Sequence, residues 1–358
     1  MSQLLGSSSI IFNRFSDLFS NKKNINKQNV IVIGYGWGSR SFCNKIDTNK
    51  YNVTIISKED AMVNSTKLKT SILSESKLLL KDYEKQNIGF INEECKNINK
   101  DEKIITTNNN SYKYDYLIVA VGSENNDFGI PGVKENCYFL KSIEDLNKLK
   151  NNINIDKNKN IIILGGGPNG IELAFQLSKK FNNIKIIEAM NSILPMFTKE
   201  TIDMVKEELN KSNIVLELSN KVNKIDKQFI VTSENNEQNN FRYDLSIWTC
   251  GIKPNSLLKT LTTNKFSVNN NLEFYNSIYA IGDIIASKEH GPPTAQNAKQ
   301  QGEYLATYFN NNFQGDSYKY EEKGKIIHTK DWIIIETSYG SFRLPYFIEP
   351  IIDYFILN

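Results

Sequence analysis

Residues that carry metal or thiol chemistry are scarce in this 358-residue chain. It has only two histidines and four cysteines, and no two cysteines form a CxxC pair. A histidine-rich metal site is therefore excluded, and we expect neither a redox-active disulfide nor a structural zinc ion. We interpret His290 and His328 as solvent-exposed or hydrogen-bonded imidazoles without a metal.

Long apolar runs and an excess of one charge are missing too. No run approaches the roughly 20 apolar residues that cross a bilayer. The net charge is only +3, from 43 basic and 40 acidic residues. A nucleic-acid partner is therefore not expected. The length is sufficient for two ordinary cores and a small third element.

The first 28 residues differ in character from the rest. Apolar side chains at helical spacing, among them Ile11, Phe15 and Leu18, precede Lys22 and Lys23. Organelle-targeting segments are amphipathic, serine-rich and poor in acids, and this segment resembles them weakly. A disordered leader without a function is the second interpretation, and the sequence does not decide between the two.

Two glycine-rich loops dominate what is present. The first is Gly34–Ser39 and the second is Gly165–Gly170, each between an apolar strand and a predicted helix. In both copies a second strand ends 23 positions after the first glycine, at Ser57 and at Glu188. One such loop is weak evidence, but two in matching contexts indicate two dinucleotide-binding units.

The glycines have separate physical tasks in such loops. The first makes the turn, the second lets a pyrophosphate approach the backbone, and the third lets helix and strand pack closely. The second loop has all three, Gly165, Gly167 and Gly170, whereas the first has Gly34, Gly36 and then the small Ser39. The N-terminus of the following helix stabilises phosphate charge with free N–H groups.

Carboxylates at strand ends indicate which nucleotides are bound. Glu188 lies where a carboxylate accepts the adenosine ribose hydroxyls, and no arginine is near to hold a ribose phosphate, so we expect NADH and not NADPH. Ser57 is the equivalent residue of the first copy, with Glu59 two positions later. Asp283, after the apolar strand Ser277–Ile281, is suited to bind the ribityl hydroxyls of a flavin.

Strands and helices alternate after residue 29, which predicts an α/β fold of two Rossmann-like domains with parallel sheets, the NADH domain inserted into the FAD domain. Residues 141–160 are charged and asparagine-rich and predict a hinge. The expected divisions are a leader at 1–28, an FAD-binding domain at 29–145 and 268–312, an NADH-binding domain at 146–267, and a C-terminal hairpin with an apolar tail at 313–358.

In this order the residues resemble the type II (alternative) NADH:quinone oxidoreductases, single-chain flavoproteins of respiratory membranes. The resemblance runs from about Val30 to Phe309. Its most specific segments are Gly34–Gly38, Tyr114–Gly122, Phe128–Val133, Gly165–Gly170 with Glu172, and Pro292–Gln301.

The resemblance implies FAD as cofactor, with NADH and a quinone as substrates. Glu172 would lie near the stacked nicotinamide and flavin, and Gln296 and Gln300 match the glutamines of the quinone site. NADH would give hydride to the flavin, which would pass two electrons to the quinone. The candidate cofactor-binding residues are Gly34, Gly36, Gly38, Ser57, Gly122 and Asp283 for FAD, and Gly165, Gly167, Gly170, Glu188 and Gly251 for the nucleotide side.

The chain departs from the family at Ser57–Leu68, where the usual prolines and aromatic residues are missing. A soluble reductase similar to apoptosis-inducing factor, and a nucleotide-binding protein that has lost its chemistry, therefore stay open beside the leading hypothesis of a quinone reductase. A homodimer stays open as well.

The predicted tail contains an apolar stripe at helical spacing. This stripe packs either on the protein itself, or a partner subunit, or on a membrane; we favour peripheral membrane contact because quinones dissolve in lipid. The location would be the mitochondrial inner membrane if residues 1–28 are a targeting segment, and the cytoplasm if they are not. The stripe consists of Leu344, Phe347, Ile348, Ile351, Ile352 and Phe355.

Overall fold

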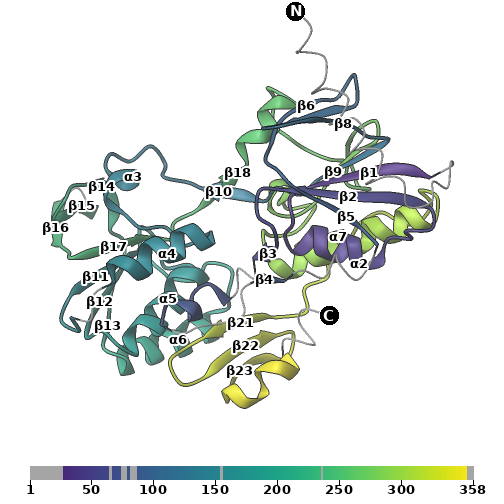
Figure 1. The fold of residues 1–358 in the computed structure, drawn as a ribbon. Coiled ribbons are helices and arrows are strands. Elements are labelled where there is room, and N and C mark those ends of the chain that lie inside the picture. Colours follow the sequence, from purple (N-terminus) through teal and green to yellow (C-terminus); the bar gives the residue numbers. More distant parts are fainter. Residues whose placement is uncertain are drawn as a thin grey trace, which may run out of the picture.

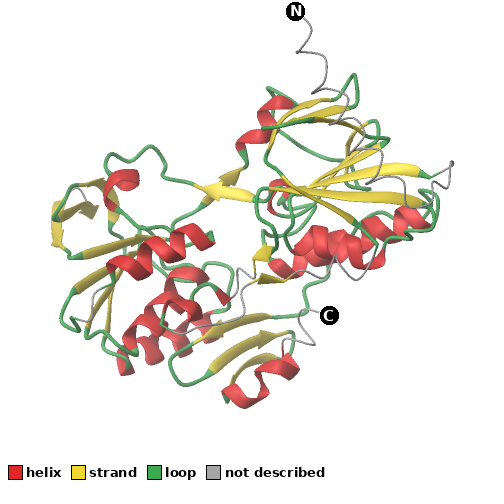
Figure 2. Cartoon of the chain, viewed as in Figure 1, coloured by secondary structure: helices red, strands yellow, loops and turns green. Residues whose placement is uncertain are grey.

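The computed structural model describes residues 27–63, 67–73, 79–80, 87–153, 156–234 and 237–352. Two α/β lobes and a small C-terminal sheet make up the molecule (Figures 1 and 2). The chain passes between the lobes through two antiparallel strands, β10 (Ser123–Asn125) and β18 (Ile252–Pro254). The predicted leader lies outside the described residues, apart from its last two positions.

The first lobe is built on a six-stranded sheet in the order β19-β20-β9-β1-β2-β5. All neighbouring pairs are parallel except β19 with β20. Its central strands are buried on both faces, which explains their unbroken apolar sequence. The strands are β1 (Gln28–Ile33), β2 (Tyr51–Ser57), β5 (Gly89–Asn92), β9 (Tyr116–Val119), β19 (Glu273–Tyr275) and β20 (Ile278–Ala280).

Two helices cover one face of this sheet, α2 (Trp37–Lys45) and α7 (Ala295–Asn310), and they lie side by side (Figure 1). A Cβ atom on Gly302 would lie 2.1 Å from the Gly38 carbonyl oxygen, so the two helices touch through their backbones. An antiparallel sheet covers the other face, formed by β6 (Cys95–Asn99), β7 (Ile104–Thr107) and β8 (Ser111–Lys113).

The second lobe is built on a fully parallel sheet in the order β13-β12-β11-β17. Alternate residues of β11 enter two cores: Ile161 and Ile163 face the helices, whereas Ile162 and Leu164 face a small antiparallel sheet. The parallel strands are β11 (Asn160–Leu164), β12 (Asn183–Ile187), β13 (Ile214–Glu217) and β17 (Leu245–Trp248). The covering elements are α4 (Ile143–Asn152), α5 (Pro168–Ser178), α6 (Lys199–Lys211), β14 (Lys221–Ile225), β15 (Phe229–Glu234) and β16 (Glu237–Arg242).

The third part is the C-terminal sheet, formed by β21 (Lys325–His328), β22 (Ile333–Thr337) and β23 (Gly340–Leu344). It packs on α5 and α6, and inserts Ile327 and Ile334 into the helix-side core of the second lobe. The predicted hairpin thus has a third strand, which occupies the start of the predicted tail.

Short elements complete the described chain. They are β3 (Met62–Val63), η2 (Thr70–Ile72), β4 (Leu79–Leu80), α3 (Val133–Asn136), η4 (Ser256–Thr260), η5 (Asp283–Ile285) and η6 (Tyr346–Ile348). Within the described ranges no helix is long and apolar enough to span a bilayer.

The segment predicted as a hinge contains helix α4. Its start is a capping box: the Asp145 N–H donates to Ser142 Oγ (3.0 Å), and the Ser142 N–H donates to Asp145 Oδ2 (3.0 Å). Helix α4 therefore occupies half of the segment 141–160, which was expected to be a hinge. The composition of the segment concealed a capping signal that was present in the sequence.

Candidate functional site

Four predicted residues follow neighbouring strands of the first sheet. Asp283 follows β20, Gly122 follows β9, Gly34 follows β1, and Ser57 ends β2. Because these strands are parallel, their carboxyl ends lie at one edge of the sheet, and the four residues lie there together. Such an edge is where ligands bind in open α/β sheets.

The first glycine loop is tight at its start and open at its centre. Gly34 has φ +89°, and a Cβ atom there would lie 2.6 Å from the Ala120 carbonyl oxygen. Ser39 Oγ donates to the Gly34 carbonyl (2.7 Å) and holds the turn closed. At Gly36, the N-cap of α2, a Cβ atom would meet no atom within 4 Å. The open position is the one that a pyrophosphate would approach.

The second loop repeats this geometry. Gly165 has φ +111°, and a Cβ atom on Gly170 would lie only 2.0 Å from the Gly165 carbonyl oxygen. Gly167, the N-cap of α5, again faces open space. Pro168 occupies the first helical position, where its missing N–H costs nothing.

Helix caps distinguish the two loops from the rest of the described structure. The other three helices of eight or more residues begin with side-chain caps, Ser142 for α4, Thr198 for α6 and Thr294 for α7. Neither α2 nor α5 has a side-chain cap. Their first-turn N–H groups are left to an outside acceptor, and the positive end of the helix dipole favours an anion. Both loops therefore fit the phosphates of a dinucleotide.

Glu188 is held against the second loop. Its Oε2 accepts from the Gly166 N–H (2.6 Å) and its Oε1 from the Met190 N–H (2.8 Å). The partly exposed carboxylate directly follows β12, the strand next to β11, which leads into the second loop. This placement suits a ribose contact.

Asp283 belongs to a hydrogen-bonded chain that reaches the connection between the lobes. Ser123 Oγ donates to Asp283 Oδ2 (2.7 Å), and Lys141 Nζ donates to Ser123 Oγ (2.7 Å). Burial lowers the pKa of Lys141, and the negative charge of Asp283 opposes that shift. The adjacent Gly282 N–H donates to Gln301 Oε1 (2.6 Å), which ties this turn to α7.

Glu172, on the second turn of α5, is the centre of a buried charged cluster. Lys69 Nζ forms an ion pair with Glu172 Oε2 and also donates to Asn169 Oδ1 (3.1 Å). From the C-terminal sheet, the His328 N–H (3.0 Å) and Nδ1 (2.8 Å) both bind Glu172 Oε1. Three chain segments therefore meet at one carboxylate.

Electrostatics fix the protonation of this cluster. Burial disfavours the Glu172 anion, but the charge of Lys69 and the bonds to His328 outweigh it and lower the pKa of Glu172 to about 2. Burial likewise disfavours imidazolium at His328, yet its hydrogen bond to the Glu172 carboxylate and the nearby carboxylate of Glu349 raise its pKa to about 9. At neutral pH the carboxylate is charged and the imidazole carries two protons.

Gln296 and Gln300 use their side-chain amides on the segment that follows α7. Gln296 Oε1 accepts from Tyr320 Oη (2.8 Å) and the Lys323 N–H (3.0 Å). Gln300 binds the backbone N–H (3.0 Å) and carbonyl (2.7 Å) of Glu321. Both therefore fasten residues 320–324 to α7, and their predicted contact with a quinone stays a prediction.

Two further candidates lie at packing positions. A Cβ atom on Gly38 would lie 3.1 Å from the Ala298 carbonyl, so this glycine brings α2 close to α7. Gly251, with φ +62°, lies under the Phe128 ring, where a Cβ atom would be 2.6 Å from Cζ.

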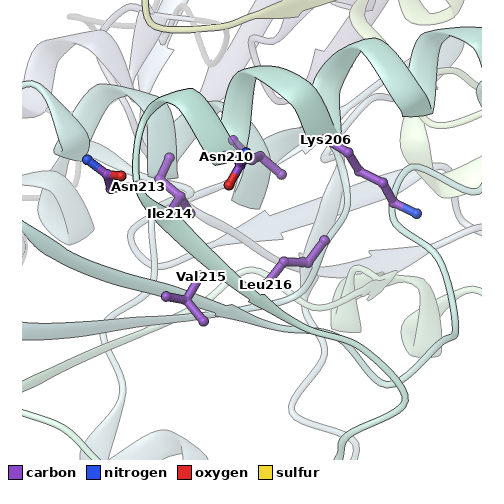
Figure 3. A pocket seen from close by; sticks show the side chains of 7 residues that line it. Lys206, Asn210, Asn213, Ile214, Val215 and Leu216 are labelled. Atoms are coloured by element: carbon purple, nitrogen blue, oxygen red, sulfur yellow. The ribbon is translucent and has the colours of Figure 1, made fainter.

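Two surface pockets lie on the second lobe, one beside β13 (Figure 3) and one near α3. Neither is lined by any predicted site residue. The pocket in Figure 3 is lined by Lys206, Leu209, Asn210, Asn213, Ile214, Val215 and Leu216. No group of three or more histidine, cysteine, aspartate or glutamate side chains in the described ranges is arranged to hold a metal.

Sequence reasoning missed Lys69, His328, Lys141 and Ser123. Lys69 and His328 are 103 and 156 positions from Glu172. No local pattern marks such contacts, and only the fold brings them together.

Comparisons with known proteins agree with this geometry. A model of the pyridine nucleotide-disulphide oxidoreductases matches residues 28–302. The chain belongs to this family. The matched range contains both glycine loops and the sheets of both lobes.

Two curated relatives are named as quinone-linked enzymes. External NADH-ubiquinone oxidoreductase 2 of Saccharomyces cerevisiae mitochondria is 29% identical, over 83% of this chain and 65% of its own. Type II NADH:quinone oxidoreductase of Staphylococcus haemolyticus is 24% identical, over 84% of this chain and 87% of its own. This chain therefore spans just under two thirds of the yeast relative.

Among solved structures, NDH2 from Plasmodium falciparum in complex with NADH matches with a TM-score of 0.80. The match covers 93% of this chain and 95% of that one at 24% identity, and shows a shared fold. The predicted fold class, two Rossmann-like units and a C-terminal extension, is confirmed.

Proposed function

We propose that the chain is an FAD-dependent oxidoreductase that takes hydride from NADH and passes two electrons to a quinone. One observation carries the proposal: in each lobe a parallel strand leads into a helix without a side-chain cap, and the glycine at the start of that helix faces open space. The names of the yeast and staphylococcal relatives support the quinone as acceptor.

Each of the two glycine loops binds one nucleotide in this proposal. Gly34, Gly36, Gly122 and Asp283, in the first lobe, hold FAD. The second lobe holds NADH through Gly165, Gly167, Gly170 and Glu188. The chain crosses between the lobes at β10 and β18, which both precede the boundaries expected at 145/146 and 267/268. Bound FAD would supply the redox chemistry, whose balance is NADH, one proton and quinone giving NAD⁺ and quinol.

The side chains of this chain do the positioning. Glu172 is fixed one turn beyond the phosphate-binding start of α5, ionised and saturated by Lys69 and His328. The amide N–H groups at Gly36 and Gly167 orient phosphates, and Glu188 orients the adenosine ribose of NADH. No side-chain nucleophile is required.

We place the membrane contact at the C-terminal sheet. Its apolar stripe is divided: Ile352 is buried against Ile333 with Leu344 and Ile348 nearby, whereas Phe347 is 82% exposed and Ile351 58% exposed. Part of the stripe therefore packs on the sheet itself, and part is free for lipid. The predicted Phe355 lies outside the described residues.

Membrane docking is tested by sedimentation with vesicles that contain anionic lipid. Deleting 342–358 would remove part of β23, so substitution is cleaner. The double variant Phe347→Ser and Ile351→Ser should leave the fold intact and move most of the protein to the supernatant. Leu344→Ser, which disturbs packing on the sheet, is the control for stability. Unchanged sedimentation of the double variant would contradict the docking proposal.

The redox proposal is tested by absorbance spectra of the purified protein before and after anaerobic NADH. A flavin spectrum that bleaches with NADH, and returns when a short-chain quinone is added, is the expected result. Protein that stays colourless after FAD is added would instead be a nucleotide-binding protein without redox chemistry.

A soluble flavin reductase is the second candidate, because Gln296 and Gln300 are both occupied by residues 320–324. Rapid reoxidation by ferricyanide but not by a short-chain quinone would favour it.

A further inference from the structure

The C-terminal sheet is fastened to the second lobe by an ion pair of Arg343 with Glu207 and by contacts at two buried carboxylates. At one, Glu336 accepts from the Thr198 N–H (2.8 Å) and from the hydroxyl of Thr201 (2.6 Å), and pairs with Lys325 (2.8 Å). At the other, His328 binds Glu172. The first is at the start of α6, away from the glycine loops. The second is at Glu172, which the family resemblance implies to lie near the stacked nicotinamide and flavin.

His328 meets Glu172 with a geometry that few residues could reproduce. Two donors of one residue, its backbone N–H and its Nδ1, converge on the single oxygen Oε1, while Lys69 occupies Oε2. The direction of the carboxylate is therefore fixed from both sides. Only 9% of the Glu172 side chain and 24% of the His328 side chain are exposed.

Other charged groups face His328 from the elements packed around it. Glu349, after η6, lies 3.5 Å from Nε2, and the Tyr346 ring stacks on the imidazole with centroids 6.2 Å apart. Lys179, at the end of α5, has its Nζ 5.8 Å from the centroid of the Tyr346 ring. Lys69 and Glu172 complete the set. The imidazole thus has a carboxylate at each ring nitrogen. The cation Lys179 contacts the Tyr346 ring that stacks on the imidazole.

We propose that His328 is a positioning residue for Glu172, and that the C-terminal sheet is through this contact part of the NADH site. The inference rests on the proposed function. His328 keeps the carboxylate ionised and fixed in direction at neutral pH. When the imidazolium loses its proton, near pH 9, Nδ1 no longer carries a positive charge toward Glu172.

A histidine titration by NMR tests the ion pair without using activity. The chain has only two histidines, so ¹⁵N-labelled holoprotein gives two imidazole spin systems, and His328→Asn identifies which belongs to His328. This imidazole should titrate near pH 9 in the wild type, and its midpoint should fall by at least one unit in Glu172→Gln. A wild-type midpoint near the ordinary value of about 6.5 would overturn the inference.

The positioning role is tested by anaerobic reduction of the bound flavin by NADH as a function of pH. His328→Leu removes the side-chain donor, and the maximal rate should fall by about 10- to 100-fold, since small misplacements near reacting groups cost this much. His328→Asn keeps a donor close to the position of Nδ1 but has no charge. This variant should reduce the flavin at a rate within about threefold of the wild-type rate, and the change of rate near pH 9 should disappear from its pH profile.

Glu336→Gln is the matched control, because it weakens a different polar attachment of the same sheet to the second lobe and leaves Glu172 untouched. It should lower the melting temperature and preserve the wild-type pH profile. If Glu336→Gln and His328→Leu changed rate and profile alike, sheet attachment alone would explain both and the positioning role would be refuted.

Failure of the proposed function has a different signature. A wild-type holoprotein whose flavin NADH does not reduce would refute that function, and the NADH-site role with it, whatever the variants do. A reactive wild type with His328 variants of equal rate and unchanged pH profile would overturn only the inference about His328.

Discussion

The open glycines at the two helix starts allow cofactor binding to be separated from folding. Gly36 has φ −107° and ψ −163°, and Gly167 has φ −75° and ψ 175°. Any L residue adopts these angles, and a Cβ atom at either position meets no atom within 4 Å. Gly36→Ala and Gly167→Ala should therefore fold as the wild type does.

The two substitutions should raise the stability of the protein slightly and weaken the binding of its ligand strongly. Replacing a glycine by alanine at a compatible backbone position stabilises a protein by roughly 0.4–1 kcal/mol, because the unfolded chain loses freedom. The same methyl group enters the space that a pyrophosphate would occupy. Loss of even two charge-assisted hydrogen bonds, each worth about 1.5–3 kcal/mol, weakens binding by at least about 100-fold.

The assay combines urea unfolding of the flavin-free protein with two titrations. Gly36→Ala should bind FAD at least about 100-fold more weakly and keep the affinity of the second loop for NADH. Gly167→Ala should retain FAD and lose NADH. Each variant thus serves as the other's control.

Gly170→Ala is the contrasting substitution, because its Cβ atom would lie 2.0 Å from the Gly165 carbonyl oxygen. It should destabilise the protein instead of sparing it. If Gly36→Ala bound FAD with wild-type affinity, or if Gly167→Ala bound NADH with wild-type affinity, the phosphates would not lie at the glycine loops.

Three further outcomes are expected. Glu188→Gln should reduce the preference for NADH over NADPH by roughly tenfold in kcat/KM, because the carboxylate repels a ribose phosphate; an unchanged ratio would place the ribose elsewhere. Gly302→Ala should lower the free energy of unfolding in urea by about 1–3 kcal/mol, because its Cβ atom would lie 2.1 Å from the Gly38 carbonyl oxygen. Gly315→Ala is the comparison: its Cβ atom would meet no atom within 4 Å, so that only the backbone strain at φ +144° should lower the stability. The raised pKa of His328 stabilises the fold fully below pH 6.5 and ceases to do so as pH rises through about 9; wild type should thus lose up to about 3 kcal/mol between pH 6 and pH 9.5 relative to His328→Asn.

The parts of the fold that sequence reasoning predicted share a local cause. Val30–Ile33 and Ile161–Leu164 are unbroken apolar runs because they are central parallel strands, and the glycines that follow them mark the turns into α2 and α5. Helix α7 could be placed because Pro292 and Pro293 precede its cap. In each case the signal and the structure lie within a few residues of each other.

The parts that were missed depend on distant contacts or on a weak local signal. Strand β23 needs the edge of β22 to pair with, and its last residue, Leu344, also belongs to the apolar stripe at helical spacing. The charged cluster at Glu172 draws on residues from three segments, including Lys69, which directly follows the stretch Ser57–Leu68 that departs from the family pattern. Helix α4 was different, because Ser142 and Asp145 are a readable cap that the surrounding asparagines concealed.

The C-terminal sheet bears on how this protein can be dissected. Residues 320–324 are bound to α7 of the first lobe, and the strands that follow insert Ile327 and Ile334 among the helices of the second. A fragment that contains only the second lobe would expose the apolar surface of α5 and α6 that the C-terminal sheet covers. A fragment that contains only the first lobe would be broken between β9 and β20, because the second lobe lies between these strands in the sequence. The unit that binds one nucleotide is thus smaller than the unit that can be expected to refold, and fragment studies should retain the chain through residue 352, because Ile352 is buried against Ile333.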